Sequence, residues 1–231
     1  MAVVGFNPKM ADNVMKAVDA SYASVGKTIG TIIQNKILNP MGEAWYAPEA
    51  VKYWKGEDGK GFDPALTECE KKIKNAYEVY KEGIDKAIKH WSENTGSKFS
   101  KSATETKQQK IIVKYDCIKK AMPDGTRGID GDKAKKVESS LKQTQNDIKS
   151  ELGKLGSKLT AVDQLFLGNN QAENARTCFK SINEAVSELF SFFTEGGKDG
   201  KSLKQVIESY IEKYGDIAKD INKTFDTTIK K

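Results

Sequence analysis

Long apolar runs are missing from this chain of 231 residues, although 38% of its residues are hydrophobic. Lysine and glutamate interrupt the apolar residues every few positions, and no run approaches the roughly 18 to 20 residues that a membrane-spanning helix needs. The N-terminus also lacks the basic stretch followed by an apolar one that is typical of a Sec signal peptide. We therefore expect a protein made in the cytoplasm, without a transmembrane helix and, if secreted, without a Sec signal.

Residues that carry chemistry are also scarce. The three cysteines are far apart and form no Cys-x-x-Cys pair, so they predict reduced thiols: Cys69, Cys117 and Cys178. His90 is the single histidine, which excludes a histidine metal triad and leaves a nucleophile with one possible base. Asp124 and Asp130 begin strings that resemble calcium loops, but neither string has a glutamate at its twelfth place, which predicts turns. We expect no catalytic residue, no metal and no cofactor.

The net charge of +6 is spread over lysines that alternate with acidic residues along helices, a pattern typical of solvated faces. Only Arg127 and Arg176 could make bidentate contacts with bases. The composition therefore does not favour nucleic-acid binding.

Apolar periodicity and helix signals predict helices in the first part of the chain. We expect a helix from residue 8 to about residue 38, ended by Asn39-Pro40, and a short helix over residues 48–55. A long helix should start at Asp63-Pro64 and end at Gly96, which suits the left-handed position that follows a helix.

The second part of the chain has the same character. Heptad spacing predicts a long amphipathic helix through residues 141–166 and a further helix over residues 175–193. Ser202 with Gln205 matches a capping box that starts the last helix. Between the two parts, residues 111–118 fit a short helix or a strand, and residues 123–125 predict a turn.

An internal repeat is the most informative pattern. The apolar positions of residues 14–32 fall on apolar positions of residues 137–155, with Gly30 falling on Gly153, and residues 73–88 fall on residues 210–225. The repeat predicts a first helical hairpin at 1–96, a linker at 97–131 and a second hairpin at 132–231. The expected fold is all-α, with two antiparallel hairpins in an elongated helical bundle.

Residues 41–54 resemble the turn of the WXG-motif (ESAT-like) family, whose members are small helical hairpins exported by type VII secretion systems. A long helix, a turn with Trp45 and an Ala-x-x-x-aromatic entry into the next helix carry the resemblance. The chain has Tyr46-Ala47 where the family has x-Gly, and its closest match to the export signal Tyr-x-x-x-Asp/Glu runs from Tyr53, between helices.

Eight residues are candidates for a turn or a partner-binding surface. A tryptophan at a hairpin turn can bury its ring against both helix ends while its N–H caps a free carbonyl. Tyr53 and Trp54 are neighbours on a short helix, so we expect that only one of them points inward. Gly26 and Gly30 each cost about 1 kcal/mol in a helix interior, which predicts a close contact with another helix, inside the bundle or on a partner. The candidates are Trp45, Tyr46, Tyr53, Trp54, Gly26, Gly30, Phe190 and Phe193.

These patterns leave three interpretations open. The first is a non-enzymatic interaction module that serves as substrate, co-exported partner or adaptor of a type VII-like secretion system in a Gram-positive bacterium. The partner would then be the secretion machinery or another helical hairpin. The second is a cytosolic or phage-related helical scaffold, and the third a membrane-active toxin that inserts the apolar residues 189–193. Because both hairpins lie in one chain, we expect a monomer with an internal pseudo-dimer.

Overall fold

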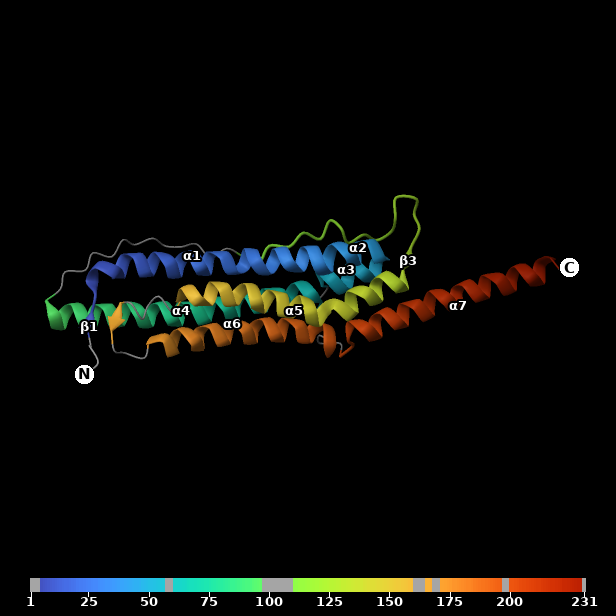
Figure 1. Ribbon diagram of the computed structural model, residues 1–231. Coiled ribbons are helices and arrows are strands. Elements are labelled where there is room, and N and C mark those ends of the chain that lie inside the picture. Colours follow the sequence, from blue (N-terminus) through green and yellow to red (C-terminus); the bar gives the residue numbers. More distant parts are fainter. Residues whose placement is uncertain are drawn as a thin grey trace. The chain divides into compact units, whose positions relative to one another are not determined.

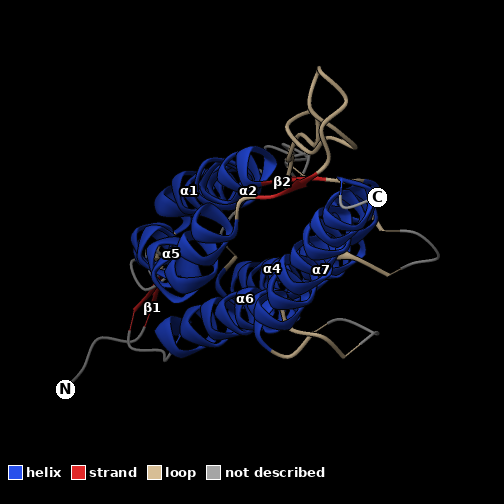
Figure 2. Ribbon diagram, turned by 90° about the vertical axis from the view of Figure 1, so that its right-hand side faces the viewer, coloured by secondary structure: helices blue, strands red, loops and turns tan. Residues whose placement is uncertain are grey.

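Helices make up almost all of the described chain. The computed structural model describes residues 5–56, 60–96, 110–159, 165–167, 171–196 and 200–229. Figures 1 and 2 show helices connected by loops. Each strand in the described ranges has two residues. The prediction of an all-α fold is confirmed. The helices are α1 (Pro8–Ile33), the π-helical turn η1 (Gln34–Leu38), α2 (Asn39–Ala44), α3 (Pro48–Lys55), α4 (Phe62–Thr95), α5 (Gly131–Leu159), α6 (Gln171–Thr194) and α7 (Leu203–Ile229).

Several predicted helix ends are confirmed. α3 covers residues 48–55 as expected, and α4 ends before Gly96, whose φ of 66° is left-handed. At the start of α7, the backbone N–H of Gln205 donates to Ser202 Oγ while the Gln205 side chain accepts from the Ser202 backbone. This reciprocal pair is the predicted capping box.

The prediction that Asn39-Pro40 ends the first helix is wrong. α1 passes into η1 and then α2, so the backbone stays helical as far as Ala44. Proline lacks an N–H group and its ring clashes with the carbonyl four residues earlier in a regular α-helix. In η1 the Asn39 N–H donates to Gln34 O, five residues back, and this wider turn places Pro40 in the first turn of α2.

The predicted helix through residues 141–166 extends too far at its C-terminal end. α5 ends at Leu159, and Phe166–Leu167 form β4, which pairs with β1 (Gly5–Phe6). The Asn7 N–H also donates to Leu165 O at 3.0 Å. At residues 165–167, backbone pairing with a distant segment therefore stands where the heptad pattern indicates helix.

The chain forms two compact units, and each unit takes residues from three parts of the sequence. Unit 1 comprises residues 1–32, 67–112 and 145–188, and unit 2 comprises residues 33–66, 113–144 and 189–231. Both hairpins of the predicted repeat thus contribute to each unit. The sequential division at residues 96 and 132 stays a prediction about the repeat.

Unit 1 is built from parts of α1, α4, α5 and α6. Asp19 of α1 lies beside Lys81 of α4, and Tyr22 lies beside Tyr77, so these two helices run antiparallel. The buried side chains that hold unit 1 together recur every three or four positions. They include Val14, Val18, Val25, Ile29, Ile73, Tyr77, Tyr80, Ile84, Ile88, Ile148, Leu152, Ile182 and Val186.

A short ladder and an aromatic core organise unit 2. β2 (Trp45–Tyr46) pairs antiparallel with β3 (Gly128–Ile129) directly before α5 begins. The buried core of unit 2 contains Ile37, Leu38, Met41, Trp45, Trp54, Phe62, Ala134, Val137, Leu141, Phe193, Leu203 and Ile207.

Residues 110–118 pack as an irregular strap instead of the predicted short helix or strand. In unit 1 the Ile111 N–H donates to Glu70 Oε2 at 3.1 Å. In unit 2 the Lys114 N–H donates to Gln34 Oε1 at 2.6 Å, and the Tyr115 hydroxyl donates to Asp63 Oδ1 at 3.0 Å. The predicted turn at residues 123–125 is present, with Gly125 at a φ of 84°.

The two parts of the repeat differ in how their last helices are covered. The positions of α4 that belong to the predicted repeat are buried, namely Ile73, Tyr77, Tyr80, Ile84 and Ile88. At the matching positions of α7, Ile217 and Ile221 are exposed by 45% and 51%. The repeated spacing therefore does not predict which apolar faces are paired. The side chain of Phe225, the last position of the predicted repeat, lies outside the part of the chain that the structure describes.

Candidate functional site

Most of the candidate residues lie in one aromatic cluster in unit 2. Its rings come from the segment around α3, the start of α4, the end of α6 and the start of α7. Centroids of neighbouring rings are 5.0 to 5.9 Å apart, the range in which aromatic pairs attract each other. The aromatic cluster consists of Trp45, Tyr53, Trp54, Phe62, Phe190, Phe192, Phe193 and Tyr210.

Trp45 has the buried position that the turn predicts, but its N–H does not cap the preceding helix. The ring is fully buried between Tyr53 and Tyr210. The Ala44 carbonyl at the end of α2 accepts a hydrogen bond from the backbone N–H of Asp130 at 2.7 Å. The Trp45 indole N–H has no hydrogen-bond partner among the described residues. Trp45 thus stabilises the turn through its apolar surface.

Tyr53 and Trp54 both contribute to the cluster, so the expectation that only one points inward is wrong. Trp54 is fully buried against Phe62, and the Tyr53 ring lies 5.2 Å from that of Phe192. Burial raises the pKa of the Tyr53 phenol above its usual range. The cluster surrounds α3 on more than one face, which makes room for two adjacent aromatic side chains. Tyr46 is half-buried and lies against Gly128 of the ladder.

Phe190 and Phe193 are also core residues, with 4% and 1% of their surfaces exposed. Leu189 and Phe192 between them are buried as well. In this structure the apolar stretch is covered, and a membrane could meet it only after unit 2 opened. Within the described ranges, no helix is long and apolar enough to cross a membrane.

Gly30 has a close contact inside the chain, but this contact is with the irregular strap and not with another helix. A Cβ at Gly30 would lie 2.5 Å from the backbone oxygen of Ile112. Gly42 has the same relation to Cys117, whose backbone oxygen would lie 2.4 Å from a Cβ. Gly26 is buried. The absence of a side chain at Gly30 and Gly42 lets the strap approach the helix backbone.

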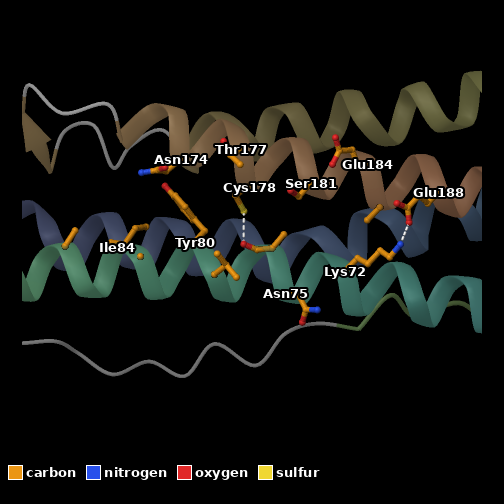
Figure 3. Close-up of a pocket in the computed structure, with 15 residues that line it drawn as sticks. Lys72, Asn75, Tyr80, Ile84, Asn174, Thr177, Cys178, Ser181, Glu184 and Glu188 are labelled. Carbon is orange, nitrogen blue, oxygen red and sulfur yellow. Dashed lines mark hydrogen bonds and ion pairs between the residues drawn. The ribbon is translucent and has the colours of Figure 1, made fainter.

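Unit 1 has an open groove between α4 and α6 that was not apparent from the sequence. This groove has a volume of about 720 Å³. Figure 3 shows the two helices side by side, with Tyr80 pointing across toward Asn174. Val79 on its rim is 71% exposed. Small side chains line both helices, and they are Ala76, Gly83, Ala87, Thr177, Ser181 and Ala185.

One ion pair and one hydrogen bond join α4 to α6 along the groove (Figure 3). Lys72 pairs with Glu188 at one end, and hydrogen bonding to Glu188 raises the pKa of the Lys72 ammonium group. The Cys178 thiol donates to the backbone oxygen of Ala76 at 3.3 Å. These contacts hold the walls of the groove in place.

A buried polar network joins α1 to α4 in unit 1. The Asp19 carboxylate accepts hydrogen bonds from the Tyr77 hydroxyl and from Lys81 Nζ, the latter at 3.2 Å. Tyr22 stacks on Tyr77 with parallel rings 3.7 Å apart. Burial, then the hydrogen bond to Asp19, raises the pKa of Tyr77. A carboxylate that is removed from water needs such partners, so the network favours one register of the two helices.

The thiols of Cys69 and Cys178 should react far more slowly than that of Cys117 at pH 8. Burial raises the pKa of Cys69 to about 12 and that of Cys178 to about 11. Only the thiolate reacts, and at pH 8 it would be present in about one molecule in 10,000 for Cys69 and about one in 1,000 for Cys178. Burial also raises the pKa of Cys117, but this thiol is partly exposed. Timed alkylation with iodoacetamide, followed by peptide mass spectrometry, measures the relative reaction rates of the three thiols. Equal rates at Cys69 and Cys117 in folded protein would contradict the packing.

The remaining residues considered for chemistry have structural contacts. Asp130 Oδ1 accepts the Lys133 backbone N–H, which lowers the pKa of the carboxyl and caps the start of α5. Asp124 Oδ1 accepts the Thr126 N–H within the predicted turn. His90 is exposed and lies near Asn94. No group of three or more metal-ligating side chains occurs among the residues that the structure describes.

Comparison with known protein-family models, with curated proteins and with solved structures gives no match to this chain.

Proposed function

We propose that this chain is a non-enzymatic protein-interaction module. The groove between α4 and α6 carries the proposal, since it is an open, partly apolar surface between two helices of unit 1, with Val79 exposed beside it. Residues 72–87 of α4 line it, so it is about 22 Å long at 1.5 Å per helical residue. A groove of this length suits a helical segment better than a small molecule.

The proposed occupant is an amphipathic helix of a partner protein. Small side chains on both walls allow a third helix to approach closely, and Val79 offers exposed apolar surface. The walls are held by their own contacts: Glu188 pairs with Lys72, and Glu184 pairs with Lys180 at 3.8 Å. The partner helix would therefore bind chiefly through its apolar face.

We further propose that the partner belongs to a type VII-like secretion system of a Gram-positive bacterium, with this chain as substrate, co-exported partner or adaptor. The resemblance of residues 41–54 to the WXG-motif turn supports this assignment. The burial of Trp45 directly after a long helical segment, and the antiparallel pairing of α1 with α4, are compatible with a helical hairpin of that kind.

A photo-crosslinking amino acid at position 79 tests the groove in the native host. We expect an adduct with a partner protein from position 79 and none from position 112, because Val79 lines the groove whereas Ile112 lies on the strap. The two side chains are matched in exposure, at 71% and 69%. Equal adduct yields from both positions, or none from position 79, would contradict a partner in the groove.

Release into the culture supernatant tests the secretion assignment. We expect release from the wild-type host and loss of release from a strain without its type VII motor ATPase. Retention in both strains, with an adduct at position 79, would refute secretion and favour the cytosolic or phage-related scaffold.

A further inference from the structure

The outer half of α7 carries an apolar stripe that its unit does not cover. The stripe consists of Leu203, Ile207, Tyr210, Tyr214, Ile217 and Ile221. These residues recur at alternating spacings of four and three, which is typical of a coiled coil. Leu203 and Ile207 at its start are fully buried, Tyr210 and Tyr214 are half-buried, and Ile217 and Ile221 are exposed by 45% and 51%. Figure 1 shows this last part of α7 extending toward the C-terminus. The stripe thus leaves the core of unit 2 while remaining apolar.

The charged residues beside the stripe would face residues of opposite charge on a second copy of α7 if the two helices ran antiparallel. Lys213 and Asp220 lie one heptad apart, each directly before a stripe residue, and so flank the same side of it. If two α7 helices pair antiparallel with Tyr214 opposite Ile217, Lys213 of each copy faces Asp220 of the other. A parallel pair would instead place Lys213 against Ala218 and gain no ion pair. The opposite flank is apolar in the antiparallel arrangement, where Ile211 meets Ala218.

Both charged groups are available for this arrangement. Asp220 has no ion-pair partner among the described residues. Lys213 contacts Glu49 at 3.2 Å, but its side chain is 53% exposed and its ammonium group has three N–H donors. It can therefore bind a second carboxylate without giving up Glu49.

We propose that this chain associates with a second copy of itself through the outer half of α7. The two helices run antiparallel, with Tyr210 against Ile221 and Tyr214 against Ile217, and two Lys213–Asp220 pairs set the register. Such a two-fold interface uses the same patch on both copies, as isologous dimers do. It is separate from the groove of the proposed function. It also reverses the expectation of a monomer, because that expectation assumed that every apolar helix face is covered within the chain.

Sedimentation of the full chain from roughly 1 µM to 1 mM tests the proposal. The expected result is a concentration-dependent dimer that the double variant I217S/I221S abolishes. Both substitutions are at exposed positions, so circular dichroism should show an unchanged fold. Val79→Ser is the matched control, since Val79 is exposed but distant from α7 in sequence, and it should leave the dimer intact. A wild-type monomer over the whole range, or a dimer that persists in I217S/I221S, would overturn the proposal.

Charge reversal tests the antiparallel register. Asp220→Lys should raise the dissociation constant at least about tenfold, because it turns both ion pairs into repulsions. The exchange E49K/K213E/D220K restores opposite charges across the interface, keeps opposite charges at positions 49 and 213, and should return the constant to near the wild-type value. If Asp220→Lys weakens association and the exchange fails to restore it, the proposed register is wrong.

Discussion

Replacing Trp45 with alanine should lower the free energy of unfolding by about 3 to 5 kcal/mol, the loss that follows removal of a fully buried large aromatic side chain. Trp45 is 0% exposed and its ring contacts Tyr53 and Tyr210. The variant would leave a cavity where α2, α3 and α7 meet, and rings that are fixed in a packed cluster cannot readily collapse into it. Denaturant titration followed by circular dichroism measures the change.

Trp91 provides the matched control for this substitution. It is half-buried and stacks on Phe6 in unit 1, with ring centroids 6.4 Å apart. Trp91→Ala should therefore cost only about 1 kcal/mol. If Trp45→Ala had no larger effect than Trp91→Ala, Trp45 would not be the core of the turn.

Gly30→Ala should destabilise the protein by about 1 to 3 kcal/mol, whereas Gly153→Ala should stabilise it by about 1 kcal/mol. The two glycines occupy matching positions of the predicted repeat. At Gly30 the new Cβ would lie 2.5 Å from the Ile112 backbone oxygen, so the strap would have to move. At Gly153 nothing lies within 4 Å, and the gain in helix propensity is unopposed. Thermal unfolding of both variants shows whether each substitution raises or lowers the stability of the protein.

A stabilising Gly30→Ala would show that the strap does not pack on α1 in solution. Gly42→Ala tests a second contact of the strap, since the new Cβ would meet the Cys117 backbone oxygen at 2.4 Å. We expect Gly42→Ala to destabilise the protein as Gly30→Ala does, and not to stabilise it as Gly153→Ala does.

Predictions from the sequence were correct for the helix ends that depend on local interactions. The bounds of α3, the end of α4 at Gly96 and the capping box at Ser202 depend on residues within one helical turn, and all are present. Pro40 shows the limit of such signals. It usually ends a helix, yet here the wider turn of η1 carries the helical backbone past it.

The candidate site was predictable as a set of residues but not as a surface. Aromatic residues at positions 45, 53, 54, 190 and 193 are apparent in the sequence, and the structure brings them into one core. Which apolar groups stay uncovered was not apparent. Val79 and Ile217 have the same apolar character as buried neighbours, and only the packing of the other segments determines their exposure.

By itself, the sequence determined the all-α class, most helix limits and the scarcity of chemical groups, because periodicity, caps and composition act over a few residues. The tertiary structure alone decided how distant segments combine. It packed residues 110–118 against Gly30 and Gly42, brought parts of both predicted hairpins into each unit, and left the outer half of α7 and the groove between α4 and α6 uncovered. The physical reason is that apolar periodicity marks a face to be buried without specifying its partner. That choice depends on the shape and close approach of segments far apart in the chain.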